Sequence, residues 1–393
     1  MASVVRVIST LSAPCSESGF NFITQAQLTT CGEIALMIER LRMRRRETIN
    51  QPMYCRQAWH SLIVVSLLTC LMSGCLPKPR GGVEGVNLTV YGFSIMKEVM
   101  EKAIFPGFSA KWKQERGEEV RFTSSFAGSE TITNQILQGV GADIAILSIE
   151  RDADRLKQGG AVTSDWHTLP QHGVINKTPF VILVRRGNPK GIRDFSDLAK
   201  PGVKLIHPDP VSSGGAQWSL LALYGAELVK SEKQTGGRDE SKAFQMLQAI
   251  WRNVISTPGS AREARTQFET GFGDALVTYE LEGLMMKAAN APVEIVVPEA
   301  TILSEHPAVV VDRNVTAAER TVVNAFMQYL WSDEAQRAFV QYHFRAIADE
   351  SLNNNPQFAQ IKFPFTVEYF GGWGRAYPDV IERIWQGRVQ KAK

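Results

Sequence analysis

The chain has 393 residues, 44% hydrophobic and 21% charged, which is typical of a globular protein and long enough for two domains. Residues 1–75 contain seven Arg and four Glu, whereas residues 76–393 contain 36 basic and 36 acidic residues. Residues 76–393, called the body below, are thus neutral and contain no long basic run, which argues against nucleic acid as the main partner. All five cysteines lie within residues 1–75, so a disulfide framework or a cysteine metal site is excluded from the body.

A short apolar segment precedes the body. Residues 61–72 (SLIVVSLLTCLM) are too few to favour a membrane span and fit the core of a signal peptide. The segment ends in LMSGC, which resembles the lipobox of bacterial lipoproteins and implies lipid attachment at Cys75. We expect a signal peptide over residues 53–75 and a flexible tether over 76–85. A short anchor or a buried helix is the alternative interpretation.

About 60 residues precede this apolar core, although a signal peptide begins close to its core. Met43 and Met53 are internal methionines at a suitable distance, and Arg56 supplies the positive flank. We therefore expect translation to start at one of them, with residues 1–52 forming a non-functional N-terminal extension.

From residue 86 onward, short strands alternate with amphipathic helices, a pattern typical of a parallel sheet covered on both faces. The first part of one lobe is expected over residues 86–175, a second lobe over 176–298, and completion of the first lobe with C-terminal helices over 299–393. Residues 165–179 look irregular and are expected to contain the first crossing between lobes. Strands are predicted at 88–91, 120–124, 142–147, 180–184, 204–207, 253–257, 274–278 and 308–312, and helices at 96–116 with a kink at Pro106, 215–230, 240–251, 262–270, 280–289, 317–330 and 333–344.

The segment LIHPDPVSSGGAQWSLLALYG, residues 205–225, predicts a strand, a turn and a helix. Gly214 and Gly215 allow a tight turn that points several N–H groups outward where the helix leaves its first donors unpaired. The helix dipole adds positive character, and Ser212 or Ser213 can cap the helix or contact a ligand. An anion site is the functional interpretation. A plain helix cap is the alternative.

The same design of strand, small residues and helix recurs at Gly128-Ser129 and at Gly259-Ser260-Ala261. Such loops lie at the carboxyl ends of strands, where open α/β sheets bind ligands. One loop belongs to the first lobe and two to the second, so closure would bring their N–H groups together. A site made only of donors suits a fully deprotonated oxyanion.

These residues match a known family. The body resembles the sulfate and thiosulfate binding proteins of bacterial ABC importers, which implies the two-lobed type II periplasmic binding-protein fold. The resemblance implies ligand contacts at Ser129, Ser213, Gly214, Gly215 and Ala261. The motifs that carry it are VRRGNPK at 184–190, KPGV at 200–203, residues 208–218, FGD at 272–274, ILSE at 302–305 and FGGW at 370–373.

Three positions depart from the family pattern. Tyr279 stands where sulfate binders place a Trp whose indole N–H touches the ion, so its hydroxyl is the expected donor. The segment FSIMK at 93–97 lacks the family's Asp and has Lys97 in place of an Arg. Glu130 follows Ser129 where relatives have a small residue, and it either favours the helix dipole or repels an anion. The choice among sulfate, thiosulfate, molybdate and phosphate therefore stays open at this point.

Supporting positions around the ligand are expected at Ser94, Gly128, Ser212 and Arg262. Arg262 either braces its loop or supplies long-range charge, whereas Arg265 is expected on a solvated helix face. The remaining candidates are interpreted as structural: no metal spacing or catalytic pairing joins His167, His172, His207, His306 and His343, and Trp218, Tyr224, Trp331, Trp373 and Trp385 are assigned to packing.

We therefore expect a monomeric binding protein in the periplasm or on the cell surface, without cofactor, metal or catalytic residue. It would deliver sulfate or thiosulfate to an ABC permease and ATPase. An enzyme acting on a sulfate or phosphate ester is the rival from another class, with Glu130 and Tyr279 as its candidates. A lipid-anchored sensor that binds the ion without transport is a third.

Overall fold

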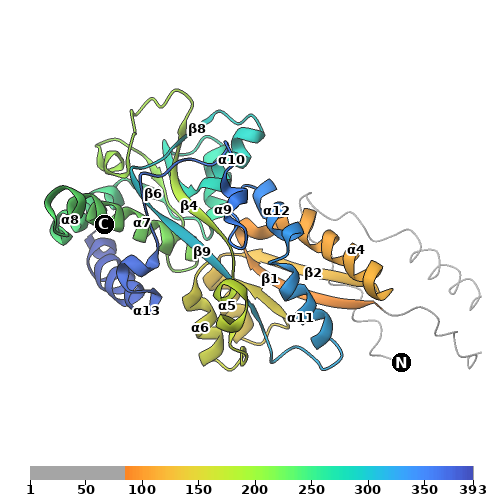
Figure 1. The fold of residues 1–393 in the computed structure, drawn as a ribbon. Helices are drawn as coiled ribbons and strands as arrows, with labels where there is room; N and C mark the ends of the chain where they lie inside the picture. Colours follow the sequence, from red (N-terminus) through yellow and green to blue (C-terminus); the bar gives the residue numbers. More distant parts are fainter. Residues whose placement is uncertain (1–84, 393) are drawn as a thin grey trace, which may run out of the picture. The chain divides into compact units, whose positions relative to one another are not determined.

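The computed structural model describes residues 85–392. The expected N-terminal extension, the signal peptide with Cys75 and nearly all of the tether lie outside these residues. The described part is a mixed α/β fold built on a ten-stranded sheet (Figure 1). The strands are β1 (Val86–Phe93), β2 (Val120–Ala127), β3 (Ile144–Ile146), β4 (Val174–Arg185), β5 (Leu205–Ile206), β6 (Val254–Ser256), β7 (Ala275–Tyr279), β8 (Val293–Val296), β9 (Ala300–Val310) and β10 (Phe363–Phe365).

The sheet has two halves, in the order β2-β1-β3-β9-β4-β7-β5-β6, with β10 beside β9 and β8 beside β4. We call the half with β1 to β3 lobe 1 and the half with β5 to β8 lobe 2. β1 pairs in parallel with β2 and β3, and β5 pairs in parallel with β6 and β7. The predicted α/β architecture with mostly parallel lobes is confirmed.

Two long antiparallel strands connect the lobes. β4 pairs with β9 over residues 174–179 and 303–307, then continues into lobe 2 beside β7 and β8, whereas β9 continues into lobe 1 beside β3. Figure 1 shows both strands in the middle of the fold. The expectation of a strand only at 180–184 was wrong, because β4 begins at Val174.

The missed part of β4 contains polar residues and Pro179, so it lacks the apolar pattern of a strand. These polar groups are buried in pairs across the two connecting strands. His306 Nδ1 lies 2.7 Å from the side-chain oxygen of Asn176, and the Ser304 hydroxyl donates to the Thr178 carbonyl at 2.7 Å. The first half of β4 is therefore a strand because it pairs with β9 and not because of its own sequence pattern. For the same reason the sequence predicted only the last residues of β9.

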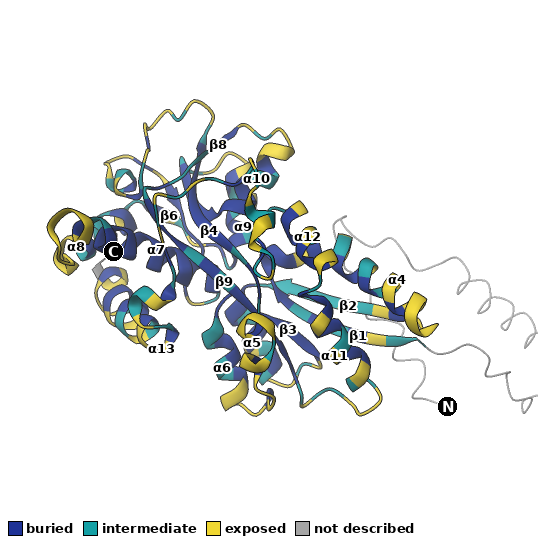
Figure 2. Ribbon diagram, viewed as in Figure 1, coloured by how far each residue is buried: buried dark blue, intermediate teal, exposed yellow. Residues whose placement is uncertain are grey.

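Helices cover both faces of the sheet, and Figure 2 shows buried residues concentrated on the strands and on the helix faces turned toward them. In lobe 1 a composite helix replaces the predicted helix at 96–116, because a π-helical turn, Met100–Ile104, precedes Pro106. The composite helix consists of α3 (Lys97–Val99), this π-helical turn and α4 (Phe105–Arg116). The other α-helices are α5 (Ser129–Leu137), α6 (Glu150–Gln158), α7 (Gly214–Thr235), α8 (Glu240–Arg252), α9 (Ala261–Glu269), α10 (Glu280–Ala288), α11 (Arg320–Tyr329), α12 (Asp333–Gln341) and α13 (Trp373–Ala376).

The C-terminal segment packs against α7 and α8. The indole of Trp373 meets Trp218 edge-on at 4.6 Å between ring centroids, and Trp385 meets Trp251 at 5.3 Å. Trp218, Tyr224, Trp331, Trp373 and Trp385 are all buried, which confirms their assignment to packing. None of the helices within residues 85–392 combines the length and the apolar character needed to cross a bilayer.

Candidate functional site

The loops that precede α5, α7 and α9 meet at one place. A Cβ added to Gly128 would overlap the carbonyl oxygen of Ser212 and lie 2.8 Å from that of Gly259. The Ser212 hydroxyl also donates to the Gly259 carbonyl at 2.8 Å. The three loops predicted from the sequence to converge are therefore in contact, and the closest approach lies at a residue without a side chain.

The helices α7 and α9 begin one residue before the predicted starts at 215 and 262. Ser213 and Ser260 are the N-cap residues of α7 and α9, and their hydroxyls accept from the backbone N–H groups of Ala216 at 3.3 Å and Glu263 at 3.2 Å. Gly128 is the N-cap of α5 in an extended conformation and contributes no side-chain cap. The serine caps satisfy the third amide of α7 and of α9 and leave the earlier amides free.

Five buried residues at these helix starts have backbone N–H groups that lack an acceptor among residues 85–392. A buried unpaired amide costs about 1–3 kcal/mol, so a cluster of them is rare unless a ligand supplies the acceptor. These residues are Ser129, Glu130, Gly214, Gly215 and Ala261.

Two hydroxyl groups from opposite lobes lie under this cluster. The Ser148 hydroxyl, after β3 in lobe 1, is 2.8 Å from the hydroxyl of Tyr279 at the end of β7 in lobe 2. A Cβ on Gly214 would lie 2.9 Å from the Ser148 Cβ, and one on Gly215 would lie 2.8 Å from the Tyr279 oxygen. A side chain at Gly214 would push the lobes apart, and one at Gly215 would collide with Tyr279 within lobe 2, so both positions need glycine.

Burial raises the pKa of the Tyr279 phenol well above its ordinary value, although the hydrogen bond with Ser148 opposes this shift. The phenol therefore keeps its proton and remains a potential donor at neutral pH. Sequence reasoning identified Tyr279 and missed Ser148. The available signal was the position of Ser148 directly after a buried strand, the same position that marks the other loops.

The Ser129 hydroxyl is engaged away from the amide cluster. It donates to the carboxylate of Asp152 at 2.5 Å and accepts from the backbone N–H of Ser148 at 3.0 Å. Only the backbone amide of Ser129 is therefore free. Sequence reasoning missed Asp152, whose only signal was an acidic residue early in α6.

Glu130 is buried, and its side chain is held by two arginines. Arg151 contacts one carboxylate oxygen at 3.0 Å, Arg155 pairs with the other, and the side-chain amide of Gln217 donates to Glu130 at 3.0 Å across the lobes. The open question about Glu130 is thus resolved, since its charge is compensated by neighbouring side chains. Burial and the nearby Glu130 carboxylate raise the pKa of Asp152 to about 7, although Arg155 and Arg151 oppose the shift.

Arg262 braces the site. It pairs with Glu282 at 2.9 Å within lobe 2 and with Glu98, which belongs to lobe 1. Burial works against the charged form of Arg262, but these carboxylates raise its pKa beyond its ordinary value. The expectation of a solvated Arg265 was wrong, because its side chain is only 13% exposed and contacts the buried Glu282 at 3.1 Å.

A family model described as bacterial extracellular solute-binding protein matches residues 88–345. The chain belongs to this family. It is 34% identical over 341 residues to the sulfate-binding protein of Synechococcus elongatus, covering 84% of this chain and 95% of that protein. It is also 32% identical over 314 residues to the thiosulfate-binding protein of Escherichia coli, covering 77% and 89%.

Among solved structures, the sulfate-binding protein SubI from Mycobacterium tuberculosis superposes with a TM-score of 0.67 at 31% identity, covering 75% of this chain and 98% of that one. The fold of this solute-binding protein is therefore that of the type II periplasmic binding proteins, as the sequence resemblance implied.

The remaining candidates lie around this site or away from it. Ser94 is buried in a 3-10 turn, Ser94–Met96, that contacts α9. His207 and His306 are buried, and burial lowers the pKa of His306 to about 3. Within residues 85–392 of the solute-binding protein, His, Cys, Asp and Glu side chains form no group of three or more that could hold a metal ion.

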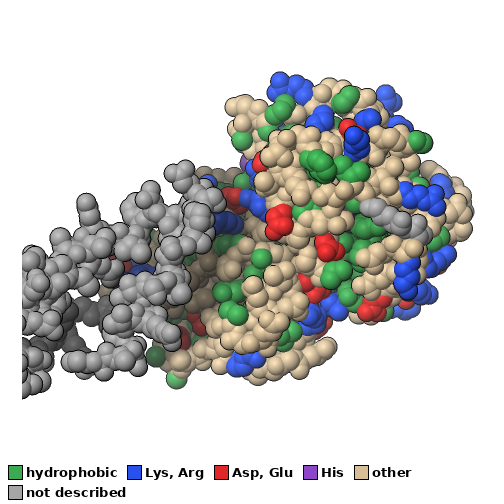
Figure 3. Space-filling model, turned by 180° about the vertical axis from the view of Figure 1, so that it is seen from behind, with side chains coloured by type: hydrophobic (Ala, Val, Ile, Leu, Met, Phe, Trp, Pro, Cys, Tyr) green, Lys and Arg blue, Asp and Glu red, His purple; other side chains and the backbone are tan. Residues whose placement is uncertain are grey.

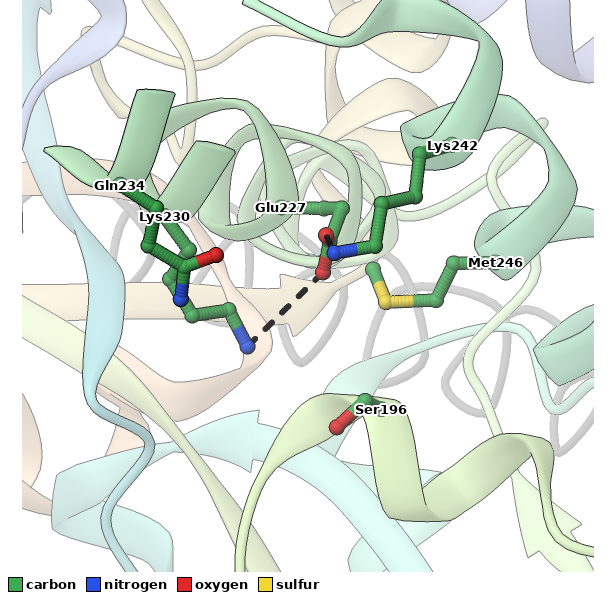
Figure 4. Close-up of a pocket in the computed structure, with 6 residues that line it drawn as sticks. All are labelled: Ser196, Glu227, Lys230, Gln234, Lys242 and Met246. Atoms are coloured by element: carbon green, nitrogen blue, oxygen red, sulfur yellow. Dashed lines mark ion pairs between the residues drawn. The ribbon is translucent and has the colours of Figure 1, made fainter. Parts of the chain in front are cut away.

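A pocket of about 240 Å³ lies elsewhere in lobe 2, between α7 and α8 (Figure 4). Lys242 and Lys230 point toward Glu227 there, at 2.5 and 3.9 Å. Lys230 also pairs with Asp194 at 3.1 Å, so two carboxylates balance the two lysines and the pocket offers a dianion little attraction. On the face shown in Figure 3, Lys and Arg side chains of the described residues are interspersed with Asp and Glu.

Proposed function

We propose that this protein captures sulfate or thiosulfate outside the cytoplasmic membrane, holding the dianion on backbone amides and hydroxyls. The observation that supports the proposal is the cluster of N–H groups on five buried residues, contributed by three helix starts in two lobes, that lack an acceptor among the described residues. Helix N-termini favour anions through both their free donors and their dipoles. The relatives are named sulfate- and thiosulfate-binding proteins, which supports sulfate or thiosulfate as the anion.

The chemistry of the surrounding side chains supports a fully deprotonated ligand. Arg151, Arg155 and Arg262 are committed to carboxylates, so the site consists of neutral donors. The protonated Tyr279 phenol adds a further donor. Sulfate and thiosulfate carry no proton at neutral pH and need no acceptor, whereas hydrogen phosphate would need one.

The binding strength can be bounded from these contacts. Each hydrogen bond to a charged group contributes roughly 1.5–3 kcal/mol net. Five or six such bonds, reduced by desolvation of the ion and ordering of the lobes, leave about 8 kcal/mol, which corresponds to a dissociation constant near micromolar.

Isothermal titration of the purified protein with sulfate and with thiosulfate tests the proposal. Gly214→Glu places a carboxylate against the hydroxyl of Ser148, and Ser213→Asp adds a negative charge beside the amide cluster. We expect both substitutions to abolish binding because like charges would face each other at close range. Undiminished binding of Gly214→Glu would contradict the assigned site.

The remaining role follows from the family and from the N-terminal sequence. We propose a monomeric lipoprotein, anchored through Cys75 in the periplasm or at the cell surface, that delivers the ion to an ABC permease and ATPase and performs no reaction. Mass spectrometry of the cellular protein should find a lipidated N-terminus at Cys75. Cys75→Ser should release the protein from the membrane fraction, and recovery of peptides from residues 1–40 would contradict the internal start.

A further inference from the structure

The two hydroxyls that join the lobes beneath the amide cluster hold one hydrogen that is not used within the protein. Ser148 and Tyr279 share a single hydrogen bond at 2.8 Å, and either oxygen can be its donor. Each hydroxyl carries one hydrogen, so one of the two hydrogens forms the shared bond and the other is available for a further acceptor. Neither hydroxyl has another acceptor among residues 85–392.

This spare hydrogen is buried. Ser148 and Tyr279 are both fully buried, so water does not substitute freely for the missing acceptor. The Ser148 backbone is held from two sides, because its N–H donates to the Ser129 hydroxyl and its carbonyl accepts from the Trp218 indole at 2.6 Å. The backbone that carries the Ser148 hydroxyl is therefore fixed beside the amide cluster.

The pair also lies against the free amides. The positions that a Cβ would take on Gly214 and Gly215 are 3.0 Å from the Ser148 hydroxyl oxygen and 2.8 Å from the Tyr279 oxygen, respectively. The O–H group without an acceptor and the unpaired N–H groups at the start of α7 therefore lie close together. A single acceptor of high negative charge would satisfy them together.

We propose that Ser148 and Tyr279 act as one two-hydroxyl donor, assembled only when the lobes close, which gives its free hydrogen to the bound oxyanion. Ser148 thereby becomes a binding residue of the chain. One of the two hydroxyls contacts the ion, and the other orients it by donating to its oxygen. The inference rests on the proposed function, because it requires an oxyanion in the amide cluster.

Such a donor differs from a Trp indole at the Tyr279 position. An indole N–H is a single rigid donor contributed by one lobe, whereas the hydroxyl pair needs a residue from each lobe. The pair therefore couples ligand contact to lobe closure, and it explains how a tyrosine serves at this position: Ser148 completes the donor.

A double-mutant cycle with Ser148→Ala, Tyr279→Phe and the double variant tests the inference, using titration calorimetry with sulfate and thiosulfate. Each substitution removes one oxygen and keeps the buried shape. Removal of the contacting hydroxyl should weaken binding about tenfold or more, and removal of the orienting hydroxyl should weaken it less. The affinity of the double variant should lie within twofold of that of the single variant that binds more weakly.

Matched controls are Ser231→Ala, a buried serine that donates to the Leu228 carbonyl, and Tyr329→Phe, a buried tyrosine of lobe 1. Both should bind as the wild type does. Thermal unfolding of every variant separates loss of contact from loss of fold, and Ser148→Ala tests the inference alone if Tyr279→Phe is unstable.

Two results would overturn the inference while leaving the proposed function intact: both single variants binding within twofold of a wild type that binds, or losses that add in the double variant. Additive losses would mean two independent contacts. Failure of the wild type to bind either anion would instead overturn the proposed function, and this inference with it.

Discussion

The hydroxyl of Ser129 donates its hydrogen to the carboxylate of Asp152 and therefore points away from the amide cluster. The serine at the start of α5 can serve a ligand only through its backbone N–H. The sequence could not distinguish whether Ser129 contacts a ligand through its hydroxyl or through its backbone N–H, and the structure assigns the hydroxyl to Asp152.

Ser129→Ala should consequently retain oxyanion affinity within a few-fold of the wild type. The substitution leaves the buried Asp152 and the Ser148 amide without their partner, so we expect about 1–3 kcal/mol of lost stability. Calorimetry with sulfate and chemical denaturation measure the two quantities. If the affinity fell more than tenfold while the fold stayed intact, the Ser129 hydroxyl would have to contact the ligand, which contradicts this assignment.

The pH dependence of stability should contain a contribution from Asp152. Its pKa is raised to about 7 in the folded protein, above the ordinary value of 3.8, chiefly by burial and by Glu130. A raised folded-state pKa gives stability that is complete below about pH 4 and is lost as the pH rises through about 7. Arg151 and Arg155, which face the same cluster, moderate this loss.

Asp152→Asn removes the titrating group and keeps a hydrogen-bonding side chain of the same size. The unfolding free energy of the wild type should therefore fall more steeply between pH 5 and pH 8 than that of the variant. Urea denaturation at several pH values measures both slopes. Equal slopes would show that Asp152 does not titrate in this range.

The ion pairs of Arg262 should stabilise the fold and the closed arrangement to different degrees. Arg262→Met leaves the buried Glu282 with Arg265 as its remaining partner, so we expect a destabilisation of about 3 kcal/mol. Glu98→Gln weakens only the contact between lobes and should cost less than about 1 kcal/mol. Equal losses in thermal unfolding would contradict a bracing role centred on Glu282.

The close approach of the three loops at Gly128 should tolerate no side chain. Gly128→Ala would set its methyl group against the carbonyl oxygens of Ser212 and Gly259, and we expect sulfate affinity to fall by at least tenfold because the lobes cannot close. Gly141→Ala, also in lobe 1, has open space around its Cβ and is the matched control. If both variants bind equally well, the loops do not meet in the liganded state.

Much of the fold and of the site could be predicted from local sequence. The starts of α5, α7 and α9 follow from small residues and caps before apolar helices, and these signals are local. The starts of α7 and α9 were therefore predicted to within one residue of Gly214 and Ala261, and the structure brings their loops together with the one before α5.

The remaining features depend on residues distant in sequence. The Ser148 hydroxyl is hydrogen-bonded to Tyr279, 131 positions further along the chain, and no local sequence pattern predicts that pairing. Arg265 looked solvent-facing because its partner Glu282 lies on another helix. The first half of β4 was missed for the same reason, since its polar residues are buried only by pairing with β9.

The central claim is that free backbone amides from two lobes hold one oxyanion. Titration calorimetry of the purified protein across sulfate, thiosulfate, molybdate and phosphate tests it most directly. The account predicts binding of sulfate or thiosulfate near micromolar affinity, with phosphate at least a hundredfold weaker because the site has no acceptor for its proton. Phosphate bound as tightly as sulfate, or no oxyanion bound at all, would contradict it.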